Sequence, residues 1–243
     1  MNKSKIEWTE STWNPISGCD KISKGCENCY AERMAKRLQA MGTRGYEDGF
    51  KVTLHPYTLD KPLKMKKPQM IFVNSMSDIF HKDVEDEYII KIFEVMNKAH
   101  WHIFQVLTKR PERLREIKNK LKWTDNIWFG TSVESNDYID RVDELRECPA
   151  KIKFLSIEPL IDSVNKINYT DIDWVIVGGE SGYGCRELKK EWVIDVKDKC
   201  QEFDIPFFFK QWGGVNKKKA GRLLDGKIYD EMPKFKKDCL LFN

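Results

Sequence analysis

The sequence contains no long uninterrupted apolar segment. None of its 243 residues belongs to a stretch approaching the roughly 18 uncharged apolar residues that a membrane helix requires. The first ten residues are polar and lack the apolar core of a signal peptide. We therefore expect no membrane partner and a cytoplasmic location.

The chain also lacks a dominant charge sign and any low-complexity linker. It has 42 Lys and Arg against 38 Asp and Glu, a net charge of +4 and a pI near 8.5. With 41% hydrophobic and 33% charged residues, the composition is that of a globular protein rather than a disordered one. The net charge is too small for a protein that coats DNA. Basic residues are nevertheless dense at 61–67 and 210–237, where they form either a solvated surface or a phosphate-contacting patch.

A disulfide framework is a poor explanation for the cysteines, because their number is odd, seven, and the expected compartment is reducing. Three of them, Cys19, Cys26 and Cys29, fall within one short segment. Cys26 and Cys29 are spaced to share one metal, and Cys19 can loop back to it. We expect the other four cysteines to be ordinary thiols.

The residues alone leave more than one kind of metal site open. A closed zinc site needs four ligands, and no fourth ligand lies nearby in the sequence. Distant residues that can supply one are His55, His81, Cys148, Cys185 and Cys200. Three thiolates on a four-iron cluster instead leave one iron open for another ligand. We favour an iron–sulfur cluster, with zinc and free or redox-active thiols as alternatives.

Short apolar runs alternate with helical patterns through most of the chain. The runs lie at residues 70–73, 103–107, 127–129, 153–157, 174–177 and 206–209. Continuous apolar runs are typical of parallel strands that are covered on both faces. Helical periodicity appears between them, at residues 88–99, 111–121, 136–146 and 191–203. A further strand ending near Gly18 brings the count to about seven.

This alternation predicts an α/β fold, a full or partial (β/α) barrel, in a single domain over residues 1–213. Residues 214–243 are expected to form a C-terminal hairpin and tail. The hairpin is predicted at residues 222–229, because Asp225-Gly226 is a favoured two-residue turn.

Polar clusters follow six of the predicted strands, at residues 74–78, 108–110, 130–135, 158–159, 178–182 and 210–213. Any one of them by itself is better explained as a helix cap. In a barrel, however, the carboxyl ends of all strands meet at one rim, which carries the chemistry. Six clusters at one rim therefore indicate an enzyme.

Residues 13–19 (Trp-Asn-Pro-Ile-Ser-Gly-Cys) and 25–31 (Gly-Cys-Glu-Asn-Cys-Tyr-Ala) resemble the phage-associated three-cysteine-motif family. This is an uncharacterised group of phage and mobile-element proteins. Further matching segments lie at 73–78, 107–111, 130–134, 156–160, 174–182 and 209–213. The resemblance covers nearly the whole chain but implies no established reaction.

The family is in turn similar to radical S-adenosylmethionine (SAM) enzymes, which have a partial or full (β/α) barrel and three cysteines after the first strand. Two features depart from their usual pattern. The cysteine spacing is C-x6-C-x2-C rather than C-x3-C-x2-C. The Gly-Gly-Glu motif stands at residues 178–180, several strands later than usual, and residues 74–78 occupy its ordinary place.

The resemblance implies a [4Fe-4S] cluster on Cys19, Cys26 and Cys29 that binds SAM and yields a 5′-deoxyadenosyl radical. The residues expected to contact SAM are Ser75, Ser77, Asp78, Thr131, Ser132, Glu134, Gly178 and Gly179. Candidate catalytic residues are Glu158, Glu180 and Lys210, and candidate substrate contacts are Arg110, Arg186 and Trp212.

The implied substrate is a nucleotide or nucleic acid, since Trp212 beside Lys210 combines a stacking surface with a cation. A reductant such as flavodoxin or ferredoxin, and a possible partner protein, complete the expected partners. The alternatives are a zinc-binding barrel protein and a nucleic-acid-binding module without radical chemistry.

Overall fold

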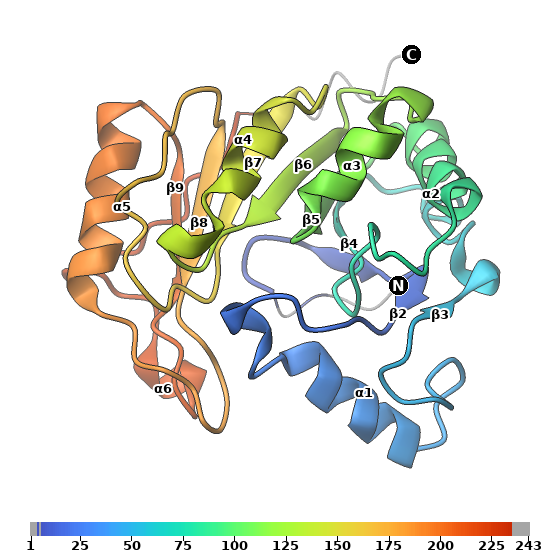
Figure 1. Ribbon diagram of the computed structural model, residues 1–243, viewed down its shortest axis with the longest axis horizontal. Coiled ribbons are helices and arrows are strands. Elements are labelled where there is room, and N and C mark those ends of the chain that lie inside the picture. Colours follow the sequence, from blue (N-terminus) through green and yellow to red (C-terminus); the bar gives the residue numbers. More distant parts are fainter. Residues whose placement is uncertain (1–3, 5, 235–243) are drawn as a thin grey trace.

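Seven parallel strands form one curled sheet in the computed structural model, which describes residue 4 and residues 6–234 (Figure 1). The strands are β1 (Ser11–Trp13), β4 (Met70–Val73), β5 (Ile103–Thr108), β6 (Ile127–Ser132), β7 (Ile152–Ile157), β8 (Trp174–Gly178) and β9 (Phe207–Gln211). Their order in the sheet is their order in the sequence, so every crossover moves the chain in the same direction. This is the winding of a barrel rather than of a doubly wound sheet. Within the described residues β1 and β9 do not pair, and the sheet is a half-barrel.

Helices cover the convex face of the sheet. They are α2 (Asp86–Lys98), α3 (Pro111–Ile117), α4 (Asp140–Arg146) and α5 (Lys190–Glu202). Apolar side chains at helical spacing, such as Ile89 and Phe93 of α2, join alternate strand residues such as Ile71 and Val73 in the main core. The four predicted helices are confirmed. In two of them one end is a 3-10 turn instead of α-helix: residues 118–120 follow α3, and residues 136–138 precede α4.

Aromatic side chains fill the concave face. Phe72, Trp128, Phe154, Trp174 and Phe208 point to this side, one from each of five strands, and Trp8 packs among them. The Trp8 ring lies 4.7 Å from Phe72 and 6.2 Å from Trp174, centroid to centroid. Packed aromatic side chains therefore fill the inside of the half-barrel below the carboxyl ends of its strands. Polar functional groups can gather only above this layer, at the rim formed by those strand ends.

The first strand differs from the prediction. The strand that ends next to Gly18 is β2 (Ile16–Ser17), and it pairs with β3 (Thr53–Leu54) outside the large sheet. The sheet strand is β1, which ends at Trp13. Pro15 lies between the two and has no N–H to donate to a ladder, so the chain leaves the sheet there.

The C-terminal segment contains the predicted turn. Leu224 and Lys227 exchange backbone hydrogen bonds of 2.9 and 3.1 Å, and Asp225 and Gly226 both have positive φ, as a type I′ turn requires. The segment then runs antiparallel to β9, where the Phe209 N–H donates to the Tyr229 carbonyl at 2.9 Å. Residues 235–243, including the end of the second basic stretch, lie outside the described residues.

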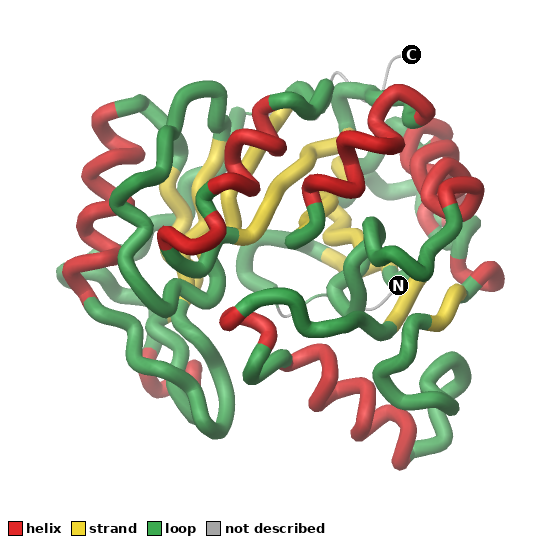
Figure 2. Tube along the Cα trace, in the orientation of Figure 1, coloured by secondary structure: helices red, strands yellow, loops and turns green. Residues whose placement is uncertain are grey.

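The remaining helices are short or peripheral. They are α1 (Tyr30–Ala40), α6 (Lys217–Ala220) and 3-10 turns at Lys24–Cys26, Pro56–Thr58 and Pro62–Lys64. Figure 2 shows that α1 lies apart from the helical layer, among the long loops at the rim. In the described part of the chain, every helix is too short or too polar to cross a bilayer.

Candidate functional site

The three cysteines lie in a loop of residues 19–29, here called the cysteine loop, which joins β2 to α1. It begins at Gly18, whose φ is +85°, and a Cβ there would lie 2.1 Å from the Lys51 carbonyl oxygen. Only glycine fits this entry. Cys19, Cys26 and Cys29 are each half-buried. The loop is fixed to the carboxyl ends of the strands at three points.

The first attachment holds Cys19. The Asp78 carboxylate, after β4, accepts hydrogen bonds from the Thr108 hydroxyl, the Lys109 N–H and the Arg110 guanidinium, all after or at the end of β5. Arg110 Nη1 then lies 3.3 Å from Cys19 Sγ, and Nη2 donates to the Asp20 carbonyl at 3.0 Å. Burial, reinforced by Asp78 and opposed by Arg110, raises the pKa of Cys19 to about 11. The thiol is therefore protonated at neutral pH unless a metal displaces the proton.

The second attachment lies beside Cys26 and centres on Glu134, after β6. This carboxylate is fully buried, and it accepts hydrogen bonds from the Ser23 hydroxyl at 2.7 Å and from Arg141 at 3.0 Å. It also forms an ion pair with Lys109. A Cβ on Gly25 would lie 2.5 Å from a Glu134 oxygen. The absence of a side chain at this position therefore lets the backbone of the loop pack directly against the carboxylate.

The same group of charges acts on the Cys26 thiol. Ser23 Oγ lies 3.4 Å from its sulfur. Burial disfavours the thiolate, but Lys109 and hydrogen bonds from the Ile22–Ser23 segment outweigh it and lower the pKa of Cys26. Two neighbouring thiols of one loop therefore have pKa values shifted in opposite directions.

The third attachment lies beside Cys29 and centres on Glu180, after β8. Asn28 Nδ2 donates to this carboxylate at 3.0 Å, and the Arg186 N–H donates at 2.9 Å. Arg186 also reaches across to the Lys24 carbonyl at 2.9 Å. Burial opposes ionisation of Glu180, yet the hydrogen bonds from Arg186 and Asn28 lower its pKa, so the carboxylate is charged at neutral pH.

Three buried acids, Asp78, Glu134 and Glu180, thus extend from three strands and fix the loop next to three different cysteines. They satisfy the loop's polar groups and leave it little freedom, which is how a ligand set is held in one geometry. The polar clusters predicted to meet at one rim do meet there.

The arrangement of the sulfurs bears on the kind of metal. One group of three potential ligand atoms within 4.8 Å of one another occurs in the described residues, and the cysteines are not part of it. Sulfurs on one zinc, each about 2.3 Å from the ion, lie within roughly 4 Å of each other. As placed, the three cysteines do not surround a single ion. Three soft thiolates beside Lys109 and Arg110 suit a larger anionic iron–sulfur cluster by their chemistry.

The candidates for a fourth ligand are dispersed. His55 is buried and lies 2.8 Å from the Ser17 hydroxyl, and Cys148 and Cys200 belong to the main core. Cys185 is half-buried on the segment that contacts the cysteine loop, and His81 lies next to Asp20. Of the four cysteines expected to be ordinary thiols, Cys148 and Cys200 are buried as such, and Cys239 lies outside the described residues.

A separate ion pair lies at the other end of the rim. Glu158, after β7, and Lys210, in β9, are 3.0 Å apart and only 14% and 18% exposed in their side chains. Between them stands Gly178 of β8, where a Cβ would lie 2.5 Å from Glu158 Oε1. The carboxylate therefore crosses β8 directly above a residue without a side chain. This pair takes no part in holding the cysteine loop.

The other predicted site residues contact the protein itself. Ser75 donates to Asn14 Oδ1 at 3.1 Å, Ser77 to the Ile16 carbonyl at 3.0 Å, and Thr131 to the Thr108 carbonyl at 3.0 Å. Ser132 is buried in β6. A Cβ on Gly179 would lie 2.1 Å from the Trp212 carbonyl oxygen. The Trp212 indole packs on Phe209 at 4.9 Å and donates to the Leu223 carbonyl at 2.8 Å.

Sequence reasoning missed Asn74, which follows β4 with a φ of +59°. It is 3% exposed, and neither its amide nitrogen nor its oxygen has a partner among the described residues. An unpaired buried amide costs roughly 1–3 kcal/mol, so such groups usually receive a water or a ligand. Its position directly after a predicted strand was the available signal. Ser23, Asn28 and Arg141 were also missed, since nothing local marks a residue that holds a distant carboxylate.

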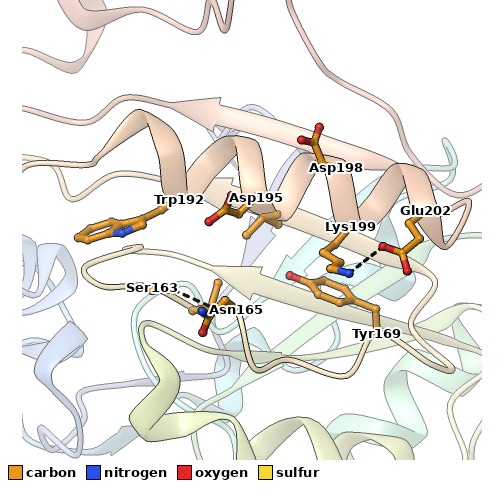
Figure 3. A pocket seen from close by; sticks show the side chains of 10 residues that line it. Ser163, Asn165, Tyr169, Trp192, Asp195, Asp198, Lys199 and Glu202 are labelled. Atoms are coloured by element: carbon orange, nitrogen blue, oxygen red, sulfur yellow. Dashed lines mark hydrogen bonds and ion pairs between the residues drawn. The ribbon is translucent and has the colours of Figure 1, made fainter.

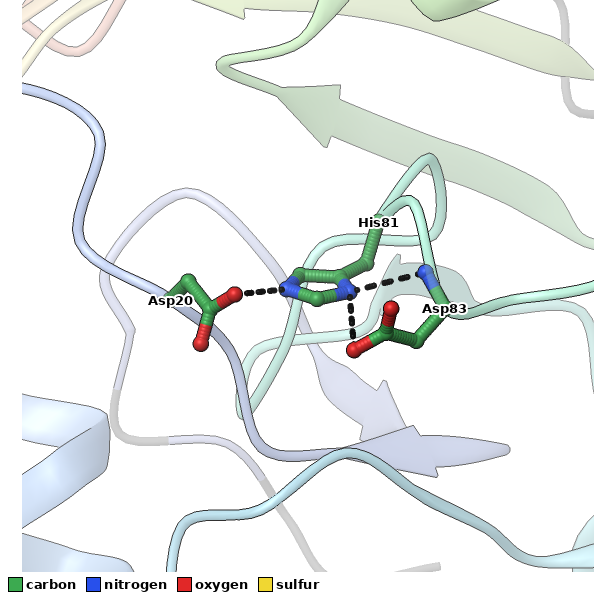
Figure 4. A group of neighbouring side chains, drawn as sticks. All are labelled: Asp20, His81 and Asp83. Carbon is green, nitrogen blue, oxygen red and sulfur yellow. Dashed lines mark hydrogen bonds and ion pairs between the residues drawn. The ribbon is translucent and has the colours of Figure 1, made fainter.

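The one compact group of ligand atoms in the described residues is Asp20, His81 and Asp83 (Figure 4). The buried His81 ring accepts the Asp83 N–H on Nδ1 at 3.2 Å, and its Nε2 lies 3.2 Å from Asp20 Oδ2. The two carboxylates lie near different ring nitrogens, so no single ion is enclosed by all three. The group instead links Asp20, next to Cys19, to the segment after β4.

A groove of about 450 Å³ lies on the helical side, between α5 and residues 163–169 (Figure 3). Tyr169 and Trp192 line it together with the Lys199–Glu202 ion pair of 2.7 Å. None of the predicted site residues lines it. The strand rim, not this groove, gathers the candidate functional groups.

Comparison with known proteins adds a family but no activity. No curated protein and no solved structure matches the chain. A family model described as "Protein of unknown function (DUF5131)" matches residues 3–233, which include the cysteine loop and all seven strands of the half-barrel. The chain therefore belongs to the DUF5131 family.

Proposed function

We propose that this protein is an iron–sulfur enzyme of the radical SAM type that modifies or repairs a nucleotide or nucleic acid. The observation that carries the proposal is the cysteine loop, whose three half-buried thiols are held at the carboxyl rim of a half-barrel by three buried acids. The second support, for a nucleotide or nucleic-acid substrate, is the resemblance of the sequence to phage and mobile-element proteins.

In this proposal Cys19, Cys26 and Cys29 hold a [4Fe-4S] cluster with one open iron. When bound, the cluster supplies the electron that cleaves SAM to an adenosyl radical. Lys109 and Arg110 lie beside Cys26 and Cys19, and their positive charge stabilises thiolates and an anionic cluster. The unpaired amide of Asn74 is available to a polar group of a bound ligand.

Glu158 and Lys210 are the proposed substrate-contacting pair. Arg110 and Arg186 already form ion pairs with Asp78 and Glu180. Both arginines hold the cysteine loop in this way, so we assign recognition of an anionic substrate group to Lys210, which pairs with Glu158 and takes no part in that attachment. A carboxylate and an ammonium within 3.0 Å of each other can also hold or pass a proton at the reacting centre.

The zinc-binding alternative needs a fourth ligand beside the three sulfurs, and the candidates for it are dispersed through the described structure. A binding module without chemistry leaves the Glu158–Lys210 pair and the buried Asn74 amide without a role. An electron donor such as flavodoxin or ferredoxin belongs to the proposal, because the cluster must be reduced again after it gives its electron to SAM.

Metal analysis tests the proposal first. Protein purified and reconstituted without oxygen is expected to be brown and to contain about four irons and four sulfides per chain. Cys26→Ala should lose the cluster, because one of three thiolate ligands is absent. Iron, sulfide and zinc are measured, followed by 5′-deoxyadenosine release from SAM after chemical reduction.

Cys148→Ala is the matched control, because Cys148 is buried in the core and should leave the iron content unchanged. One zinc per chain and no iron would contradict the proposal and favour the zinc-binding barrel. A cluster without any SAM cleavage would also contradict it.

A further inference from the structure

Helix α1 presents an unusual outer face. Only Ala31 and Ala35 of its eleven residues are buried, against Met76. With 3.6 residues per turn, positions 30, 34, 37 and 41 share one side of the helix, next to the buried face. Tyr30, Met34 and Met41 are 53%, 43% and 66% exposed there. Large apolar side chains aligned along a solvated helix usually mark a contact surface.

Positive charge borders this stripe. Residues 30–44 contain four basic side chains and one acid, Glu32, which pairs with Lys36 at 2.7 Å and with Lys21 at 3.1 Å. Arg33 donates to the Ser181 and Tyr183 carbonyls, which do not neutralise its charge. Among the described residues no carboxylate pairs with Arg33, Arg37 or Arg44. The helix therefore has an unneutralised positive edge beside an apolar stripe.

The stripe leads directly to the candidate site. Tyr30 follows Cys29, and its hydroxyl donates to the Ser75 carbonyl at the rim. Arg33 fixes the neighbouring loop of residues 181–184, at whose tip Tyr183 is 88% exposed. Helix α1 runs outward from the cysteine loop (Figure 1), so the stripe begins at the rim with Tyr30 and ends away from it with Met41.

We infer that the outer face of α1, formed by Tyr30, Met34, Arg37 and Met41 with Arg33 beside it, binds a single-stranded nucleic acid and guides it to the rim. Such a surface needs side chains on which bases can pack and neighbouring cations that pair with the phosphates. A duplex hides its base faces and meets only the positive edge. The inference rests on the proposed nucleic-acid substrate and names the surface that recruits it.

The test is fluorescence anisotropy with a labelled 12-nucleotide single strand of mixed sequence, at several salt concentrations. Wild-type protein should bind it more tightly than the matching duplex, with affinity falling as salt rises. Arg37→Ala should weaken binding several-fold and reduce the salt slope by about 1. Met34→Ala with Met41→Ala should weaken binding at least about fivefold with the slope unchanged.

Lys91→Ala is the control, because Lys91 is an exposed cation on α2, in the helical layer of the molecule. Equal losses for Arg37→Ala and Lys91→Ala, or no binding at low salt, would overturn the inference. Binding of an acidic redox protein that Arg37→Ala abolishes, without oligonucleotide binding, would also overturn it and assign the face to an electron donor.

The two proposals fail separately. Binding needs no SAM chemistry, so a strand bound through Arg37 in protein that never cleaves SAM supports the surface while contradicting the enzyme. SAM cleavage without any oligonucleotide binding overturns the surface alone.

Discussion

Gly178→Ala is expected to lower SAM-dependent activity roughly a hundredfold while leaving the fold intact. The new Cβ would lie 2.5 Å from Glu158 Oε1. The carboxylate is the end of a flexible side chain, so it moves aside, and its 3.0 Å contact with Lys210 breaks. A displacement of about 1 Å at reacting groups has an effect of this size. The measurement is 5′-deoxyadenosine formation alongside chemical unfolding, in which this variant should lose less stability than the neighbouring substitution Gly179→Ala.

Gly179→Ala supplies the contrasting neighbour. Its Cβ would meet the Trp212 backbone carbonyl at 2.1 Å, and a backbone cannot turn away. We expect this variant to lose stability, by roughly 1–3 kcal/mol or more. Gly178→Ala combined with Glu158→Gln should be no less active than Glu158→Gln alone, because both act on one contact. Full activity in Gly178→Ala would remove the pair from the mechanism.

Glu134→Gln is expected to destabilise the protein by about 3–5 kcal/mol. The glutamine retains the shape and can still accept from Ser23, but it leaves Lys109 and Arg141 without their buried counter-charge. Since Glu134 is fully buried, solvent cannot replace the lost partner. The attachment beside Cys26 should loosen as well, so Cys26 should react faster with a thiol reagent. Urea unfolding and thiol labelling measure the two effects.

Glu144→Gln is a suitable control. Glu144 pairs with Arg115 on the helical surface, where the Arg115 side chain is 62% exposed. Surface pairs of this kind contribute about 1 kcal/mol or less. If Glu134→Gln costs no more than Glu144→Gln, the buried acid does not hold the loop in the manner described.

Local sequence patterns determined the elements of this protein. Short continuous apolar runs bounded by turn residues predicted buried parallel strands, and the six predicted strands were found within three residues of their limits. The Asp225-Gly226 turn follows from the backbone freedom of two residues. The polar strand ends were expected at one rim because the carboxyl ends of successive parallel strands must lie on the same side.

Tertiary structure alone decided what those polar residues do. Asp78, Glu134, Glu158 and Glu180 look alike in the sequence, each an acid after a strand. Three of them hold the cysteine loop, and only Glu158 faces Lys210 across Gly178. Partners such as Ser23 and Glu134 are 111 residues apart, and their pairing depends on the curl of the sheet and the path of the loop. Periodicity reports the neighbours along one element, whereas a site is made by side chains that meet only when the half-barrel has formed.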